Sequence, residues 1–164
     1  MIAIVRMFSC DKACCPAINN LLKVLSKKGR TINESKFVRI TSDDDTYFFA
    51  AKDTEKSFPD NLAGMALIFF QWRPEGIYAG IHSVAVSADY QGKGIGSMLD
   101  KEMIKTAKEF AGRYKEKFSI ELTSNPNNPD RHKAINMYLK HGFRLVAESV
   151  DEHGTNLYRL EVTP

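Results

Sequence analysis

The sequence predicts a mixed α/β protein, and three observations support that prediction. Apolar stretches of strand length alternate with segments in which apolar residues recur at helical spacing. One strand, ending in Ser-Val-Ala-Val, runs through a glycine-rich loop directly into a helical segment. The 164 residues, 43% of them hydrophobic and 26% charged, are ordinary for a soluble globular protein and long enough to bury a core without disulfides.

The amino-terminal segment is expected to contain a strand, a helix and a loop. Residues 1–7 are mostly apolar and predict a buried first strand. A helix is expected from about Cys14 or Pro16 to Gly29, because apolar side chains recur at helical spacing and glycine favours a helix end. Residues 30–45 are polar and contain three consecutive aspartates, so a solvated loop is expected there.

The rest of the chain continues the alternation. Strands are expected at about 46–52, 63–70, 79–87, 118–123, 143–149 and 156–162. Between the second and third of these, Gln71–Gly76 predicts a hairpin-like connection. Helices are expected at 95–111 and 129–141, and the second has a capping Asn128, a proline at its first position and Gly142 at its end.

The glycine-rich loop is the most informative feature of the chain. Gly92, Gly94 and Gly96 alternate with other residues immediately before and into the predicted helix. Glycine permits positive φ, so several backbone N–H groups can converge on a phosphate, and the first helical turn adds further donors. Lys93 adds a positive charge. The loop is therefore interpreted as a diphosphate-binding site.

Glycine spacing alone leaves other diphosphate ligands open. A P-loop needs Ser or Thr after its lysine, whereas Lys93 is followed by Gly94. A dinucleotide-binding loop has Gly-x-Gly-x-x-Gly and an acid closing the next strand, whereas this loop has Gly-x-Gly-x-Gly and Glu121 lies inside the next strand. Both known loops fit poorly, but the glycines do not exclude them.

Two motifs together resemble the GCN5-related N-acetyltransferases (the GNAT family). The first is Gln91–Gly96 with its Asp-Tyr lead-in, similar to the family's acetyl-CoA pyrophosphate loop. The second is the run Glu121–Ser124 followed by Arg131, Ala134, Tyr138 and Gly142-Phe143. The resemblance covers about residues 46–162 in detail and the first 45 residues only by order of elements.

The resemblance implies a single N-acetyltransferase domain over residues 1–164. Its fold is expected to be a central mixed, mostly antiparallel sheet of about seven strands flanked by helices, with a splayed parallel pair holding acetyl-CoA. The implied reaction moves the acetyl group of acetyl-CoA, the co-substrate, to a primary amine by direct attack through a tetrahedral intermediate. Two other classes stay open: a non-catalytic acyl-CoA-binding sensor or regulator, and a nucleotide-binding protein that uses the same loop.

The resemblance also assigns site residues. The implied acetyl-CoA contacts are Val84, Ala85, Val86, Gln91, Gly92, Lys93, Gly94, Ile95, Gly96, Ser97 and Asn125. The three residues on the strand would bind through their backbone, and an N–H near a bulge in that strand would meet the oxyanion. The family's CoA-contacting asparagine is assigned to Asn125, with Asn127 as the alternative.

Two side chains are implied in catalysis. Tyr138 is implied as the general acid that protonates the leaving CoA thiolate, because a tyrosine hydroxyl stays protonated at neutral pH. His82 occupies the position where many relatives carry glutamate, and an imidazole with a pKa near ~6.5 is a suitable base, directly or through water. A partly buried structural role for His82 is equally open, and Glu121 is the other candidate base. The mechanism requires no metal, and no ligand cluster suggests one.

Three cysteines, Cys10, Cys14 and Cys15, lie close together. An odd number in one short stretch does not make a disulfide framework, and no histidine nearby completes a zinc site. They are expected to pack at the start of a helix as small apolar residues. Reactive-thiol chemistry stays open for any cysteine that is exposed.

The net charge and the hydropathy of the chain limit the kinds of partner and the cellular location that can be expected. The net charge of +3 is too small to predict nucleic-acid binding, and the longest apolar run, Met65–Phe70, is too short to cross a membrane. The protein is therefore expected to be cytoplasmic. The expected acceptor is a small-molecule or peptide amine, and acids at Asp43–Asp45 and at Asp151 and Glu152 would attract a cationic one. A homodimer through edge strands is implied by the resemblance, with the terminal strand as the candidate edge.

Overall fold

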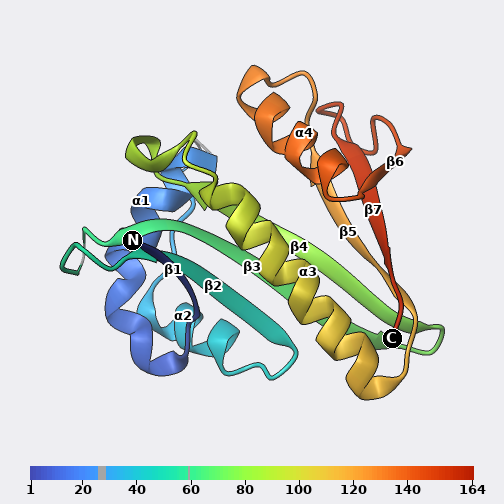
Figure 1. Cartoon of the computed structure of the whole chain (residues 1–164), viewed down its shortest axis with the longest axis horizontal. Coiled ribbons are helices and arrows are strands. Elements are labelled where there is room, and N and C mark those ends of the chain that lie inside the picture. The colour runs from blue at the N-terminus through green and yellow to red at the C-terminus, as the bar shows by residue number, and fades with distance from the viewer. Residues whose placement is uncertain (26–28, 59) are drawn as a thin grey trace. The chain divides into compact units, whose positions relative to one another are not determined.

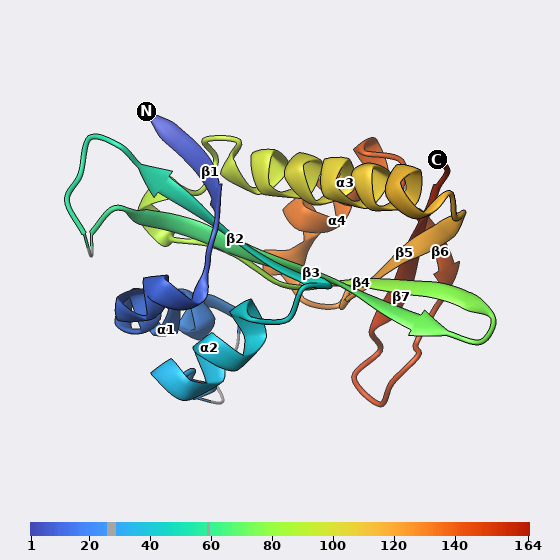
Figure 2. The same cartoon turned by 90° about the horizontal axis from the view of Figure 1, so that it is seen from below.

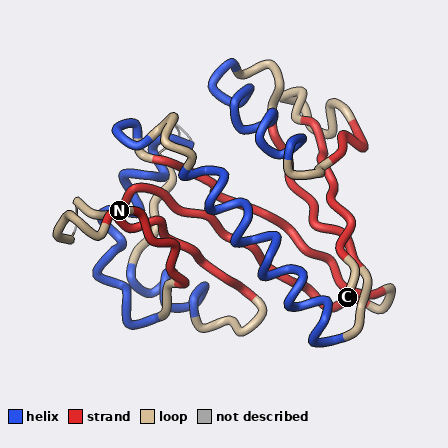
Figure 3. Tube along the Cα trace, viewed as in Figure 1, coloured by secondary structure: helices blue, strands red, loops and turns tan. Residues whose placement is uncertain are grey.

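The computed structural model describes the whole chain except residues 26–28 and 59. The chain contains both helices and strands, often in consecutive groups of one kind, as Figures 1 and 3 show. The strands are β1 Ile2–Arg6, β2 Thr46–Asp53, β3 Leu62–Arg73, β4 Gly76–Val86, β5 Phe118–Ser124, β6 Arg144–Ala147 and β7 Asn156–Val162. The α-helices are α1 Cys15–Leu25, α2 Glu34–Thr41, α3 Ile95–Tyr114 and α4 His132–Lys140. None of the helices in the described part of the chain is both long and apolar enough to cross a bilayer.

The strands form one seven-stranded sheet in the order β1-β2-β3-β4-β5-β7-β6. Every pairing whose direction is resolved is antiparallel except that of β4 with β5, which is parallel. The parallel ladder is short: it joins Tyr78–Gly80 to Ser119–Glu121. The mixed, mostly antiparallel seven-stranded sheet with one parallel pair is therefore confirmed.

The position of the terminal strand corrects one expectation. β7 lies between β5 and β6, paired on both sides, and β1 and β6 form the edges of the sheet. The prediction that the terminal strand offers an edge to a second copy is therefore wrong. The sequence did not reveal this because the order of strands in a sheet is set by crossovers between distant segments.

The chain divides into two compact units. The amino-terminal unit contains Met1–Phe69 and His82–Met103, and the carboxy-terminal unit contains Phe70–Ile81 and Ile104–Pro164. Three elements, β3, β4 and α3, contribute residues to both units.

In the amino-terminal unit, helices cover both faces of the strands. Figure 2 shows α1 and α2 on one face of β1–β3 and the beginning of α3 on the other. The alternation along β3 explains this arrangement. Gly64 faces α3, because a Cβ there would lie 3.3 Å from Leu99 and 3.4 Å from Ile95, whereas its neighbour Met65 belongs to the core beneath α1 and α2.

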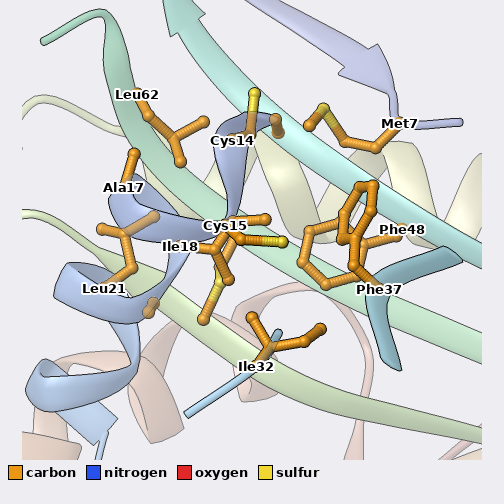
Figure 4. Close-up of a cluster of buried hydrophobic side chains, with 13 residues drawn as sticks. Met7, Cys14, Cys15, Ala17, Ile18, Leu21, Ile32, Phe37, Phe48 and Leu62 are labelled. Atoms are coloured by element: carbon orange, nitrogen blue, oxygen red, sulfur yellow. The ribbon is translucent and has the colours of Figure 1, made fainter. Parts of the chain in front are cut away.

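The core beneath α1 and α2 contains two of the three cysteines (Figure 4). Cys14 and Cys15 are buried, and Cys10 is exposed. Removal from water raises the pKa of both buried thiols, so they stay protonated and pack as apolar groups. The expected packing role is thus confirmed for Cys14 and Cys15, which lie where a 3₁₀ segment passes into α1.

The expected loop over residues 30–45 is wrong, because α2 lies within it. Asn33 caps this helix by accepting a hydrogen bond from the backbone N–H of Lys36 at 2.8 Å. Phe37 is fully buried and meets the ring of Phe48 edge-on, with centroids 5.8 Å apart. One large buried side chain holds a helix whose other residues are mostly polar, which is why composition suggested a loop.

In the carboxy-terminal unit, aromatic rings join α3 to the sheet. Phe110 of α3 stacks on Phe70 with ring centroids 3.9 Å apart, and Phe118 meets Phe70 edge-on at 5.7 Å. The segment before α4 begins as predicted: the side chain of Asn128 accepts the N–H of Asp130 at 3.0 Å, and Pro129 opens a 3₁₀ turn that leads into the helix. After α4, Gly142 has a φ of +96°, the left-handed conformation expected at a helix end.

Candidate functional site

The glycine loop connects β4 to α3, as the sequence predicted. A 3₁₀ turn at Ala88–Tyr90 follows β4, and α3 begins at Ile95. Gly92 and Gly94 have φ values of +78° and +79°, and a Cβ at either position would have no atom within 4 Å. Conformation rather than crowding therefore requires glycine at both positions. The first turn of α3 carries no acidic side chain to oppose an anion at its N-terminus.

Tyr90 fixes this loop to the end of β2. Its side chain is buried, and its hydroxyl donates a 2.8 Å hydrogen bond to Oδ2 of Asp53. That hydrogen bond is the main reason why the pKa of Asp53 lies below its ordinary value. Asp53 also accepts a hydrogen bond from the amino group of Met1 at 3.4 Å. The loop is thus held by residues far away in the sequence.

Two lysines lie on the ring of Tyr90. The Nζ atoms of Lys56 and Lys93 are each 5.0 Å from its centroid, within cation–π range. Sequence reasoning found Lys93 in the loop but missed Lys56. No local pattern marks Lys56, because its proximity to the loop depends on the contact between Tyr90 and Asp53.

The side chain of Gln91 turns back toward β4. Its Nε2 donates to the carbonyl oxygen of Val86 at 3.2 Å. Gln91, Gly92 and Lys93 are all exposed. Gln91 therefore closes the connection between strand and loop.

The middle of β4 departs from regular strand geometry. Ser83 has a φ of +57°, in the left-handed region that residues with a side chain seldom occupy. Val84, Ala85 and Val86 follow it, with Ala85 buried and the two valines half-buried. An irregular residue redirects the backbone N–H and C=O groups around it, and such irregularities cluster near active sites.

His82 lies next to Ser83 and stacks on Phe69 of the neighbouring strand. The two ring centroids are 5.4 Å apart and the rings are inclined by 23°. The residue keeps solvent contact, but partial removal of the imidazole from water lowers its pKa below the ordinary value. The ring is therefore neutral at pH 7 and able to accept a proton.

The other candidate base, Glu121, is engaged elsewhere. Its Oε1 accepts hydrogen bonds from Nε and Nη2 of Arg159 at 3.0 and 2.6 Å. This pairing joins β5 to β7 across a directly opposed register position. The geometry gives Glu121 a structural partner, and the role of His82 as the base stays a prediction.

Tyr138 and Asn125 belong to the carboxy-terminal unit. Tyr138 is buried on α4, and its ring meets Phe143 edge-on with centroids 5.8 Å apart. The amide group of Asn125 donates to the carbonyl oxygen of His153 at 2.8 Å, and its Oδ1 accepts the N–H of Asn127. Asn125 thus joins two loops, and its contact with CoA stays a prediction.

The predicted site residues are distributed over both units. His82, Val84–Val86 and the run from Gln91 to Ser97 all belong to the amino-terminal unit, where one strand, one loop and one helix N-terminus present them in sequence. Tyr138 and Asn125 belong to the other unit. Across residues 1–25, 29–58 and 60–164, no three His, Cys, Asp or Glu side chains gather as a metal site would require.

Several solved structures have this fold. An acetyltransferase of the GNAT family from Streptococcus pneumoniae is 18% identical, with a TM-score of 0.76 over 99% of each chain. Arabidopsis thaliana NAA60, solved in complex with acetyl-CoA, is 14% identical, with a TM-score of 0.73 over 99% of each chain. The ribosomal-protein-S18-alanine N-acetyltransferase from Escherichia coli is 18% identical, with a TM-score of 0.67 over 100% of this chain and 96% of the other.

The sequence itself matches the profile of the Acetyltransferase (GNAT) family over residues 17–143. No match was found among curated proteins. The matched range contains β4, the glycine loop, β5 and α4, which include the motifs that carried the resemblance. The chain therefore belongs to the acetyltransferase (GNAT) family.

Proposed function

We propose that this protein transfers the acetyl group of acetyl-CoA to a primary amine. The observation that carries this proposal is the continuous run from His82 to Ser97. It joins a neutral imidazole, a strained strand residue and a glycine loop at the N-terminus of a twenty-residue helix. Family membership supports acetyl transfer in general. The run supplies candidate groups for binding the cofactor, accepting a proton and stabilising the oxyanion, and the proposed general acid, Tyr138, lies outside it.

The glycine loop fits a diphosphate. The positive φ at Gly92 and Gly94 and the first turn of α3 supply backbone N–H groups, and no acid lies in that turn. Lys56 and Lys93 add two positive charges beside Tyr90. We assign the pyrophosphate to Gln91–Ser97 and the pantetheine amides to the backbone of Val84–Val86, in the manner of an added strand.

Acetyl-CoA, when bound, supplies a thioester that an amine can attack. A protonated amine cannot attack, and an amine with a pKa near ~10.4 is mostly protonated at pH 7. His82 would accept the amine proton, directly or through water. Backbone N–H groups beside Ser83 would stabilise negative charge on the carbonyl oxygen, and the Tyr138 hydroxyl would give its proton to the leaving sulfur.

The experiment is a thiol-release assay with acetyl-CoA and a panel of primary amines, with the product identified by mass spectrometry. The expected result is release of one CoA thiol for each N-acetylated amine formed. Release of thiol without an acetylated amine would indicate hydrolysis. Tight acetyl-CoA binding with no release by any amine would contradict the transferase and support the sensor.

A further inference from the structure

An open pocket with two cationic side chains in its lining lies beside α2. The pocket, called the α2 pocket below, has a volume of about 520 Å³, which lies within the usual range for small-molecule sites of roughly 300–1,000 Å³. Its lining comes from α2, from the turn after α2, and from two strands of the sheet. The lining residues used below are Lys36, Arg39, Ile40, Asp43, Leu67 and Phe69.

The floor of the α2 pocket is apolar and only partly covered. Ile40, Leu67 and Phe69 are all half-buried, although Leu67 and Phe69 lie on β3, an interior strand of the sheet. Other side chains on this face of the sheet, outside the pocket, are buried in the core beneath α1 and α2. The floor of the pocket is therefore less covered than the rest of this face. The floor can therefore receive the apolar part of a ligand with little rearrangement.

The rim is cationic. Lys36 and Arg39 are three residues apart on α2, so they project from the same side of the helix, and both are exposed. Among the residues that the structure describes, neither has a carboxylate within ion-pair distance. The acid of the pocket, Asp43, uses both oxygens in its own turn, accepting the N–H of Asp45 at 3.0 Å and the hydroxyl of Thr46 at 3.1 Å.

The pocket adjoins the candidate base. Phe69 lines the pocket and also stacks on the imidazole of His82. An amine that reaches His82 therefore has beside it the ring of Phe69, which also lines the α2 pocket.

We propose that the α2 pocket holds the body of the acceptor, and that Lys36 and Arg39 bind a carboxylate at the end opposite the reacting amine. The acceptor class is thus a small ω-amino acid with an apolar spacer. This inference rests on the proposed function for the role of the amine, whereas the carboxylate site rests on the pocket alone. It differs from the expectation of a cationic acceptor drawn from the loop aspartates, because the donors without partners in this pocket are cations.

The test compares ligands that differ only in charge. The carboxylate probes are 4-aminobutanoate, 6-aminohexanoate and 8-aminooctanoate, each matched by the alkylamine and the diamine of the same carbon number. Binding to ¹⁵N-labelled protein is followed by the backbone amide shifts of Arg39, Leu67 and Phe69. We expect at least one carboxylate probe to bind at least about fivefold tighter than its alkylamine, with the diamine weakest.

Substitutions test whether Lys36 and Arg39 cause the preference for the carboxylate probe over the alkylamine. The double variant Lys36→Gln/Arg39→Gln should bind the carboxylate probe and the alkylamine equally, and Arg39→Glu should favour the diamine. Lys101→Gln/Lys108→Gln, which removes the same charge from exposed positions on α3, should keep the preference. Equal binding of all three probe types by the unaltered protein, or a preference that survives the double variant, overturns the proposal.

An acetyl-transfer assay distinguishes failure of the carboxylate site from failure of the proposed function. If acetyl-CoA is consumed equally well with hexylamine and 6-aminohexanoate, the transferase stands and the carboxylate site is overturned. If 6-aminohexanoate binds with the expected preference but no amine is acetylated, the carboxylate site stands, and the proposed function and the acceptor role fail together.

Discussion

Ser83 and His82 are adjacent on β4, and the proposed function gives both a part in the reaction. A left-handed φ is unfavourable for a residue with a side chain by roughly 1–2 kcal/mol, so the +57° at Ser83 must be stabilised by the structure around it. The result is a strand whose backbone direction changes directly after His82. A regular strand would direct the same N–H groups into the ladder and away from a substrate oxygen.

The role of His82 predicts a particular pH dependence. A base must be unprotonated, and partial removal of the His82 imidazole from water lowers its pKa below the ordinary value of about 6.5. We therefore expect kcat/KM to rise with pH through a midpoint below about 6.5 and then to level off. In His82→Gln, kcat should fall by roughly a hundredfold, and this acidic limb should disappear.

The matched control is His153→Gln, since the His153 side chain is 63% exposed. The limb should be unchanged in that variant. An acidic limb that persists in His82→Gln would assign the proton transfer to another group.

Tyr138 offers a test that separates catalysis from packing. Tyr138→Phe keeps the ring that meets Phe143 and removes only the hydroxyl. Because Tyr138 is proposed as the general acid, we expect this variant to have a kcat lower by roughly a hundredfold and an unchanged Kd for acetyl-CoA. Tyr158→Phe, at another buried tyrosine, is the control and should leave kcat unaltered. Equal kcat values in all three proteins would remove Tyr138 from the mechanism.

Among the elements, the glycine loop depends most on distant parts of the chain. β4 and α3 set its two ends, and Tyr90 fastens its middle to Asp53 at the end of β2. Preorganisation of this kind reduces the entropy that binding a diphosphate must remove. Loss of the anchor should therefore weaken cofactor binding as well as lower the stability of the fold.

Tyr90→Phe tests this anchor. The ring and its contacts with Lys56 and Lys93 are retained, and only the hydrogen bond to Asp53 is lost. We expect a loss of about 1–2 kcal/mol in the free energy of unfolding and a several-fold higher Kd for acetyl-CoA. Tyr114→Phe, at an exposed ring on α3, should change neither value. A Kd equal to that of the unaltered protein would show that the loop needs no anchor.

The lowered pKa of Asp53 predicts how the free energy of unfolding depends on pH. Because its pKa is lower in the folded protein than the ordinary value of about 3.9, the folded state binds the proton less readily than the unfolded state. Its contribution is therefore present above about pH 4 and is lost as the pH falls through the folded-state pKa. Asp53→Asn should be less stable than the unaltered protein at pH 6, with a difference that shrinks below about pH 4. Urea unfolding measures this, and Asp89→Asn, exposed in the same connection, should show no such trend.

For the whole molecule, the sequence predicted what local patterns encode. The strand, glycine loop and helix around Gly94 could be predicted because positive φ and helical periodicity leave a direct signature. The 3₁₀ turn that leads into α4 and the glycine that follows α4 were predictable for the same reason, through Asn128 and Gly142, although α4 itself begins at His132. The helix α2 was missed because burial of Phe37, a tertiary contact, stabilises it.

The parts of the site that sequence could not predict are those that long-range contacts create. Lys56 reaches the loop only through Tyr90, and Phe69 meets His82 only because β3 and β4 are neighbours in the sheet. The position of β7 inside the sheet follows from the same kind of contact. Pairings of this kind are set by the whole fold and have no local signature.

The central claim is that the glycine loop binds acetyl-CoA, and calorimetric titration tests it most directly. Acetyl-CoA, NAD and ATP are each titrated into the unaltered protein and into Gly94→Val, whose side chain is strained at a φ of +79°. We expect micromolar binding of acetyl-CoA, little or no binding of NAD and ATP, and at least about tenfold weaker acetyl-CoA binding by the variant. Failure of acetyl-CoA to bind, or tighter binding of NAD or ATP, would contradict the claim.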